Sequence, residues 1–183
     1  MKKLMFALAA VVMAIGAQAN SVVWSAKING ATAAGVGASD YMVYLLDNSV
    51  WGTYVDSETG VMKQGYLTDG AFDSAAFSVS GAALATGENT ASGLAAGNIN
   101  YAIVLVSADS SKYSVLTTGT IATYDPESQS ATMIPIASTT AKKVLGTNST
   151  DNLTWNAVAV PEPTSGLLML VGLGALALRR RRA

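Results

Sequence analysis

The residues that could do chemistry in this chain are carboxylates, hydroxyls and lysines, because its 183 residues include no histidine and no cysteine. Without histidine there can be no Ser-His-Asp triad, no imidazole acid–base catalysis and no His-containing metal site. Without cysteine there can be no thiolate nucleophile, zinc–thiolate site or disulfide bond. Most hydrolase mechanisms are thereby excluded, and paired carboxylates or a Ser/Lys pair are the enzymatic options that remain.

Two short segments carry neighbouring carboxylates. Asp56 and Glu58 are two residues apart, which on a strand would place both on one face, as a glycosidase requires. However, the segment 56–60, Asp-Ser-Glu-Thr-Gly, is typical of a hairpin turn. Asp125-Pro126-Glu127 is also typical of a turn, and it lacks the spacing of an EF-hand calcium loop. We therefore expect no catalytic residue, no metal site and no cofactor.

Aromatic side chains offer a second kind of chemistry, the stacking of sugar rings on flat polar-edged surfaces. Trp24 and Trp155 lie in strand-like patterns, so we expect them in the core. Trp51 and Tyr54 lie near a predicted hairpin tip and are the better candidates for ligand binding.

The positive charge of the chain is concentrated at its two ends. Residues 20–159 contain five lysines against eleven acidic residues, a formal charge of −6, whereas the whole chain carries −1. A negative surface disfavours nucleic acids and anionic lipids. We therefore expect no nucleic-acid partner.

Alternating and continuous apolar patterns predict strands. Val22, Trp24, Ala26 and Ile28 alternate with more polar residues, which predicts a first strand. Residues 41–46 are apolar on both faces, and turn chemistry at 47–48 followed by Val50 to Val55 predicts a hairpin. Residues 99–106 are apolar on both faces, which predicts a central strand.

The rest of the body gives weaker signals. Further short strands are predicted at 113–116, 119–124 and 153–158. The Ala, Gly and Ser-rich stretches 31–39 and 80–98 predict loops or a weak helix, and the alanines of 71–85 favour one helical turn or more. The pattern predicts a mainly β fold, a single β-sandwich or jelly-roll-like domain over residues 20–159.

The N-terminus predicts a signal peptide over residues 1–19. Two lysines precede an apolar stretch from Leu4 to Gly16, and Ala17 and Ala19 supply the small residues that a signal peptidase reads. We expect cleavage before Asn20, and hence export.

The C-terminus combines a polar motif, an apolar segment and a basic end. The motif is Val160, Pro161, Glu162 and Pro163, followed by Thr164. As a helix the apolar run would span about 20 Å, whereas the hydrocarbon core of a bilayer is about 30 Å thick. We therefore predict a short helix that lies in the membrane only transiently. Residues 179–183 form a basic stop that would stay on the cytoplasmic side, with four arginines, Arg179, Arg180, Arg181 and Arg182.

This arrangement of residues 160–183, with its motif at 160–164, hydrophobic segment at 165–178 and basic tail, resembles the PEP-CTERM sorting signal of Gram-negative bacteria. The element is also labelled the ice-binding protein C-terminal domain, a label that says nothing of the body. The resemblance implies recognition of the Pro-Glu-Pro motif by an exosortase, a membrane-embedded cysteine transpeptidase. It also implies passage through the inner membrane to the cell surface or the exopolysaccharide matrix.

These observations favour a non-enzymatic exported protein of the cell surface or matrix, with an exosortase-type enzyme and signal peptidase as partners and matrix polysaccharide as a further one. The alternative is a carbohydrate-binding module or a carboxylate-based glycan hydrolase that acts in the matrix. A third interpretation keeps the C-terminal helix as an uncleaved anchor.

Overall fold

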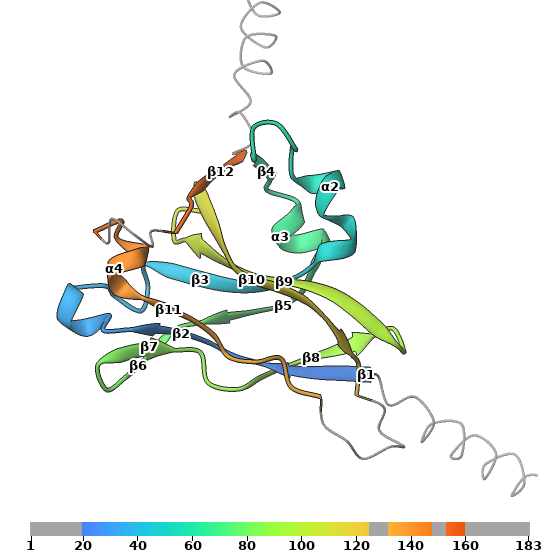
Figure 1. Cartoon of the computed structure of the whole chain (residues 1–183), viewed down its shortest axis with the longest axis horizontal. Helices are drawn as coiled ribbons and strands as arrows, with labels where there is room; N and C mark the ends of the chain where they lie inside the picture. Colours follow the sequence, from blue (N-terminus) through green and yellow to red (C-terminus); the bar gives the residue numbers. More distant parts are fainter. Residues whose placement is uncertain (1–19, 125–131, 148–152, 160–183) are drawn as a thin grey trace, which may run out of the picture.

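Strands dominate the part of the chain that the computed structural model describes, residues 20–124, 132–147 and 153–159 (Figure 1). The prediction of a mainly β fold is confirmed. The predicted signal peptide, the sorting signal and the segment 125–127 lie outside the described residues. None of the described helices is long and apolar enough to cross a membrane.

A six-stranded sheet forms the first layer. Its order is β4 (Met62–Lys63), β12 (Asn156–Ala159), β10 (Lys112–Ala122), β9 (Asn98–Ser107), β3 (Tyr41–Asp47) and β5 (Ala71–Ala76). The strand β9 is antiparallel to both neighbours, so that Val104 pairs with Val115 of β10 and with Tyr44 of β3. The prediction that residues 99–106 form a central strand is therefore confirmed.

A second layer faces the first (Figure 1). It is built on β1 (Asn20–Trp24) and β2 (Ala26–Asn29), which follow each other with a break at Ser25. The other strands of this layer are β8 (Asn89–Leu94), β7 (Ala83–Ala85), β6 (Ser78–Ser80) and β11 (Ala137–Thr140). The strand β1 pairs with β8, whereas β2 lies between β7 and β11. The predicted first strand thus forms, but its two halves pair with different neighbours.

The two layers enclose an apolar core that we call the inter-sheet core. Its large buried side chains include Val22, Trp24, Ile28, Val43, Leu45, Phe77, Leu84, Ile99, Tyr101, Ile103, Leu105 and Ile134. Val22, Trp24 and Ile28 are fully buried, which confirms the alternation expected from the sequence. Burial of each large side chain contributes about 1.5–3 kcal/mol to folding.

The other face of the six-stranded sheet carries a second core, which we call the cap core. It contains Leu46, Val55, Met62, Tyr66, Leu67, Ala102, Val104, Val106, Tyr113 and Val158. Short elements cover it: η2 (Asn48–Val50), α2 (Trp51–Tyr54) and α3 (Tyr66–Asp69), and the short strands β4 and β12 at one end of the sheet contribute Met62 and Val158. Because β9 is apolar on both faces, it contributes to both cores.

The predicted hairpin over residues 41–55 is wrong. The strand β3 forms, but its partners are β5 and β9, and residues 48–54 are helical. The Asp47 carboxylate accepts the backbone N–H of Ser49 at 2.9 Å, which caps the first helical turn. The apolar residues that predicted a strand pack instead as one face of these short helices.

The helix predicted over residues 71–85 is also wrong, because this segment forms β5, β6 and β7. Helix propensities differ by less than about 1 kcal/mol per residue, so pairing of β5 with β3 and of β7 with β2 outweighs them. Phe77, buried at 6% exposure, lies where the chain passes from one sheet to the other. The stretch 80–98 likewise contains β7 and β8, whereas 31–39 contains only a 3-10 turn, η1 (Thr32–Ala34).

The two strands predicted at 113–116 and 119–124 are a single strand, β10, with a bulge at Leu116. Val115 and Thr117 pair with consecutive residues of β9, which leaves Leu116 as the extra residue. Near the C-terminal end, a four-residue helix, α4 (Ala141–Val144), follows β11, and the strand predicted at 153–158 begins only at Asn156.

Candidate functional sites

The strand β12 leads directly to the predicted sorting motif, whose residues 160–163 lie outside the described part of the chain. This strand lies between β10 and β4, with Ala157 opposite Lys112 and Val158 opposite Met62. The backbone N–H of Val158 also donates to the Ser111 carbonyl at 2.9 Å, and the Val158 side chain is 4% exposed. The motif therefore begins two residues after a buried valine of the cap core, Val158.

A polar turn lies beside this junction. The Asp109 carboxylate accepts hydrogen bonds from the hydroxyl of Ser107 at 2.5 Å and from the backbone N–H of Ser111 at 3.0 Å. These hydrogen bonds lower the pKa of Asp109 to about 2, and the bond from the Ser107 hydroxyl has the largest effect. The turn between β9 and β10 therefore keeps its negative charge across the physiological range of pH.

The structure places both candidate ligand-binding residues, Trp51 and Tyr54, on α2. Tyr54 stacks on Tyr66 with ring centroids 4.7 Å apart and planes 2° apart. Trp51 meets Tyr66 and Tyr113 edge-on, with centroids at 5.7 and 6.1 Å. Each ring thus has contacts in an aromatic cluster on the cap core, and each is only half-buried. Their role in ligand binding stays a prediction.

The turn at residues 56–60 is confirmed. The Asp56 carboxylate accepts the N–H of Thr59 at 2.7 Å, the Thr59 hydroxyl at 2.8 Å and the N–H of Glu58 at 3.0 Å. These hydrogen bonds lower the pKa of Asp56, and the bond from the Thr59 N–H has the largest effect. A general acid of a glycosidase needs a raised pKa, so the environment of Asp56 does not suit that role.

A polar cavity of about 420 Å³ lies between this turn and α2. Gly52 and Thr53 of α2 line it on one side, and Asp56 and Lys63 line it on the other. The Lys63 ammonium donates to the Thr53 carbonyl at 2.8 Å. The cavity offers hydroxyls, a carboxylate and an ammonium group, which a sugar can contact, but the rings of Trp51 and Tyr54 do not line it. Within the described ranges, no three acidic side chains gather as a metal site.

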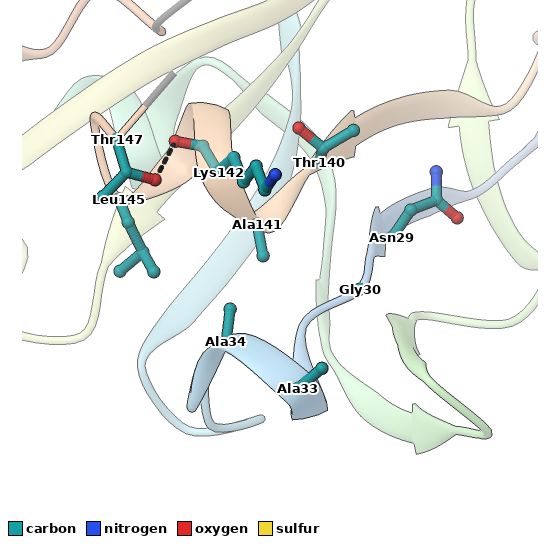
Figure 2. A pocket seen from close by; sticks show the side chains of 9 residues that line it. All are labelled: Asn29, Gly30, Ala33, Ala34, Thr140, Ala141, Lys142, Leu145 and Thr147. Atoms are coloured by element: carbon teal, nitrogen blue, oxygen red, sulfur yellow. Dashed lines mark hydrogen bonds between the residues drawn. The ribbon is translucent and has the colours of Figure 1, made fainter. Parts of the chain in front are cut away.

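Sequence reasoning missed a second, more apolar pocket of about 740 Å³ (Figure 2). Figure 2 shows Ala33 and Ala34 of η1 on one wall and Ala141 and Leu145, from α4 and the residue after it, on the other. The remaining lining residues are Asn29, Gly30, Thr140, Lys142 and Thr147. Methyl groups with one ammonium group at the rim suit a small apolar group with an anionic end. The only sign of this pocket in the sequence is the richness of the chain in alanine.

The other two tryptophans differ in burial. Trp24 is fully buried, as predicted, and its Nε1–H donates to the Asp73 carboxylate at 2.8 Å. Trp155 packs against the inter-sheet core but remains partly exposed and lies before β12. Its ring stacks on Tyr41 with centroids 5.7 Å apart, and the Lys112 ammonium lies 5.0 Å from its centroid.

Comparison with known proteins gives one match. Residues 159–182 match the family model of the PEP-CTERM protein-sorting motif, which confirms the resemblance seen in the sequence. No curated protein and no solved structure matches the chain. A signal of this kind marks a protein that is exported to the envelope or surface of a Gram-negative bacterium and sorted by exosortase-type machinery.

Proposed function

We propose that this chain is a non-enzymatic protein of the cell surface or the exopolysaccharide matrix, released from the membrane when an exosortase cuts at its C-terminal motif. The observation that carries the proposal is the match of residues 159–182 to the PEP-CTERM motif. The turn at residues 56–60 supports the non-enzymatic role, because local hydrogen bonds from Thr59 and Glu58 occupy the Asp56 carboxylate.

The sorting step is tested on the full chain in a bacterium that makes exosortase. The double variant Pro161→Ala, Glu162→Ala is compared with wild type and with a control variant, Glu58→Ala, in an exposed turn. We expect wild type and Glu58→Ala to lose Arg179–Arg182, and the double variant to keep them in the membrane fraction. Mass spectrometry of the C-terminus measures the result. Surface-exposed wild-type protein with an intact C-terminus would instead show that the tail is a permanent anchor.

A second candidate function is carbohydrate binding in the matrix. It is supported by the polar cavity of about 420 Å³ lined by Gly52 and Thr53 of α2, the helix that also carries the half-buried Trp51 and Tyr54. In this function Trp51 and Tyr54 stack on sugar rings, while Lys63 and the hydroxyl groups of the cavity bind the sugar's polar groups.

Retention on exopolysaccharide extracted from the producing strain tests this function. We expect Trp51→Ala to lower retention at least fivefold and Trp155→Ala, on another part of the surface, to leave it unchanged. Because Trp51 packs against Tyr66 and Tyr113, both variants must first show the wild-type circular dichroism spectrum and thermal midpoint. No retention of the wild type would remove the carbohydrate-binding function, and release of free sugar would remove the non-enzymatic one.

A further inference from the structure

The last strand of the body ends directly before the sorting motif. The strand β12 ends at Ala159, and the motif begins at Val160. Only the five residues 160–164 separate β12 from the hydrophobic segment, and five extended residues span at most about 18 Å. While that segment lies in the membrane, as the sorting function requires, the end of β12 must lie close to the membrane surface. A membrane-embedded sorting enzyme therefore meets the folded body at this end.

The pairing of β12 conflicts with what such an enzyme needs. An enzyme that cuts a peptide chain binds an extended segment whose backbone groups have no other partners. The strand β12, however, lies between β10 and β4, which hold it on both edges. A single residue, Val160, separates β12 from the first proline of the motif, Pro161. The paired body thus leaves almost no free chain on the N-terminal side of the motif.

Few contacts hold β12 in the sheet. It pairs with β10 at Asn156 and Ala157 and with β4 at Val158 and Ala159, whereas β9 makes nine pairs with β10 and seven with β3. Of the four side chains of β12, only that of Val158 is buried. Release costs these pairs, the burial of one valine and the contact of the Asn156 side chain with Tyr113. Elements with so few contacts open locally while the rest of a domain stays folded.

The residue before β12 is held more firmly. The ring of Trp155 stacks on Tyr41 with centroids 5.7 Å apart, and its Nε1–H donates to the Val144 carbonyl at 3.2 Å. The Lys112 ammonium lies 5.0 Å from the centroid of the same ring. All three partners lie outside β12, so they stay in place when β12 leaves the sheet. Release that begins at the C-terminal end therefore stops at Trp155.

We propose that β12 leaves the sheet as far as Trp155 when the sorting enzyme binds the motif, so that the enzyme takes residues 156–163 as one extended segment. The four residues of β12 add about 13 Å to the reach of the motif. When the enzyme lets go, β12 returns to its place between β10 and β4, and Val158 enters the cap core again. The proposal rests on the proposed sorting function and deepens it, because it names the segment that the enzyme needs.

The absence of cysteine allows β12 to be fixed in the sheet. Lys112→Cys with Ala157→Cys, the locked variant, places two cysteines directly opposite each other on β10 and β12, where a disulfide can form after export. The matched control is Asn100→Cys with Thr120→Cys, an exposed pair directly opposite on β9 and β10.

The loss of residues 179–182 is followed over time by mass spectrometry, on the full chain in a bacterium that makes exosortase. We expect the locked variant to lose them at least ten times more slowly than wild type. The control pair and Lys112→Cys alone, which also lacks the ammonium group beside Trp155, should keep the wild-type rate.

A linker insertion shows whether reach is the cause. Gly-Ser-Gly-Ser, inserted between Ala159 and Val160 of the locked variant, supplies four free residues, and we expect it to restore the rate to within twofold of wild type. A locked variant cut at the wild-type rate would overturn the proposal. So would a locked variant that the insertion does not rescue, because the disulfide would then act in another way. A wild type that keeps residues 179–182 would instead overturn the sorting function.

Amide hydrogen exchange of the purified full chain tests the release of β12 without the enzyme. The Val158 N–H, which donates to the Ser111 carbonyl, is compared with the N–H of Val104 on the central strand β9. We expect Val158 to exchange at least a hundredfold faster than Val104, and the disulfide of the locked variant to slow Val158 at least tenfold. Exchange of Val158 as slow as that of Val104 would overturn the proposal whether or not the tail is cut.

Discussion

The two cores of this domain lie on opposite faces of one sheet, and different kinds of structure close them. Hydrogen-bonded strands cover the inter-sheet core, with β1 and β2 supplying alternate fully buried side chains. Short helices of three or four residues cover the cap core, together with the two short strands at one end of the sheet, β4 and β12. A ladder fixes its strands over a long distance, whereas isolated short helices depend on the side chains beneath them. The comparison predicts that the inter-sheet core is the more rigid of the two.

Two adjacent leucines on β3 allow a matched test of this difference. Leu45 belongs to the inter-sheet core and Leu46 to the cap core, and both are fully buried. Each Leu→Ala change should cost about 2–5 kcal/mol, because it removes apolar contacts and leaves a cavity. We expect the loss at Leu45 to be the larger, since paired strands cannot move in to fill the space, whereas η2 and α2 can.

Urea unfolding of each variant, followed by tryptophan fluorescence, measures the two free energies of unfolding. The chain offers the control in the same experiment, because the two variants share residue type, strand and burial. A loss at Leu46 equal to or larger than that at Leu45 would show that the cap core is as rigid as the inter-sheet core.

Glycine substitutions should give opposite signs in the two regions. A Cβ atom at Gly119 of β10 would lie 2.7 Å from the Tyr101 hydroxyl and 2.9 Å from its ring carbon Cζ. We expect Gly119→Ala to destabilise the domain by about 1–3 kcal/mol, because the tyrosine is held in the inter-sheet core. Gly52 of α2 has no atom within 4 Å of such a Cβ, so Gly52→Ala should stabilise it by about 0.4–1 kcal/mol.

Thermal unfolding of the two variants beside wild type measures both signs. A neutral Gly119→Ala would mean that the Tyr101 ring can move aside and that the inter-sheet core is softer than its strand pairing suggests. A destabilising Gly52→Ala would mean that α2 needs a glycine for a reason other than space.

The sequence predicted the inter-sheet core much better than the cap core. Two local patterns predicted it: the alternation from Val22 to Ile28 and the run 99–106, which is apolar on both faces. In both segments the side chains lie on the faces that the pattern predicted. The cap core gathers Tyr66, Tyr113 and Val158 from segments far apart in the chain, and α3 is too short to show a helical period. Alanine-rich segments misled for a related reason, because their weak helix preference was overcome by pairing with distant strands.

The candidate sites follow the same division. The sorting motif is a linear signal of consecutive residues, so the sequence alone identified it. The polar cavity beside α2 joins a helix with a turn, and the pocket of Figure 2 joins η1 with α4 across more than a hundred residues. Sites of this kind depend on contacts between distant segments, which periodicity and spacing do not reveal.

The smallest expected effect concerns the turn at Asp109, where β9 and β10 meet beside the end of β12. Its pKa is lowered from 3.8 to about 2, first by the Ser107 hydroxyl and then by Ser111. A lowered pKa means that the carboxylate stabilises the folded state fully above pH 3.8 and loses this contribution as the pH falls toward 2. We expect Ser107→Ala to move the midpoint of this carboxyl upward, toward its ordinary value.

Carbon-detected NMR of the Asp109 carboxyl group between pH 5 and about 1.5, at temperatures where the domain stays folded, follows this titration. The wild-type domain, titrated beside the variant, is the reference. An unchanged midpoint in Ser107→Ala would assign the low pKa to Ser111 instead. The end of the cap core at β12 would then depend on a turn held by Ser111, whose carbonyl also accepts the N–H of Val158.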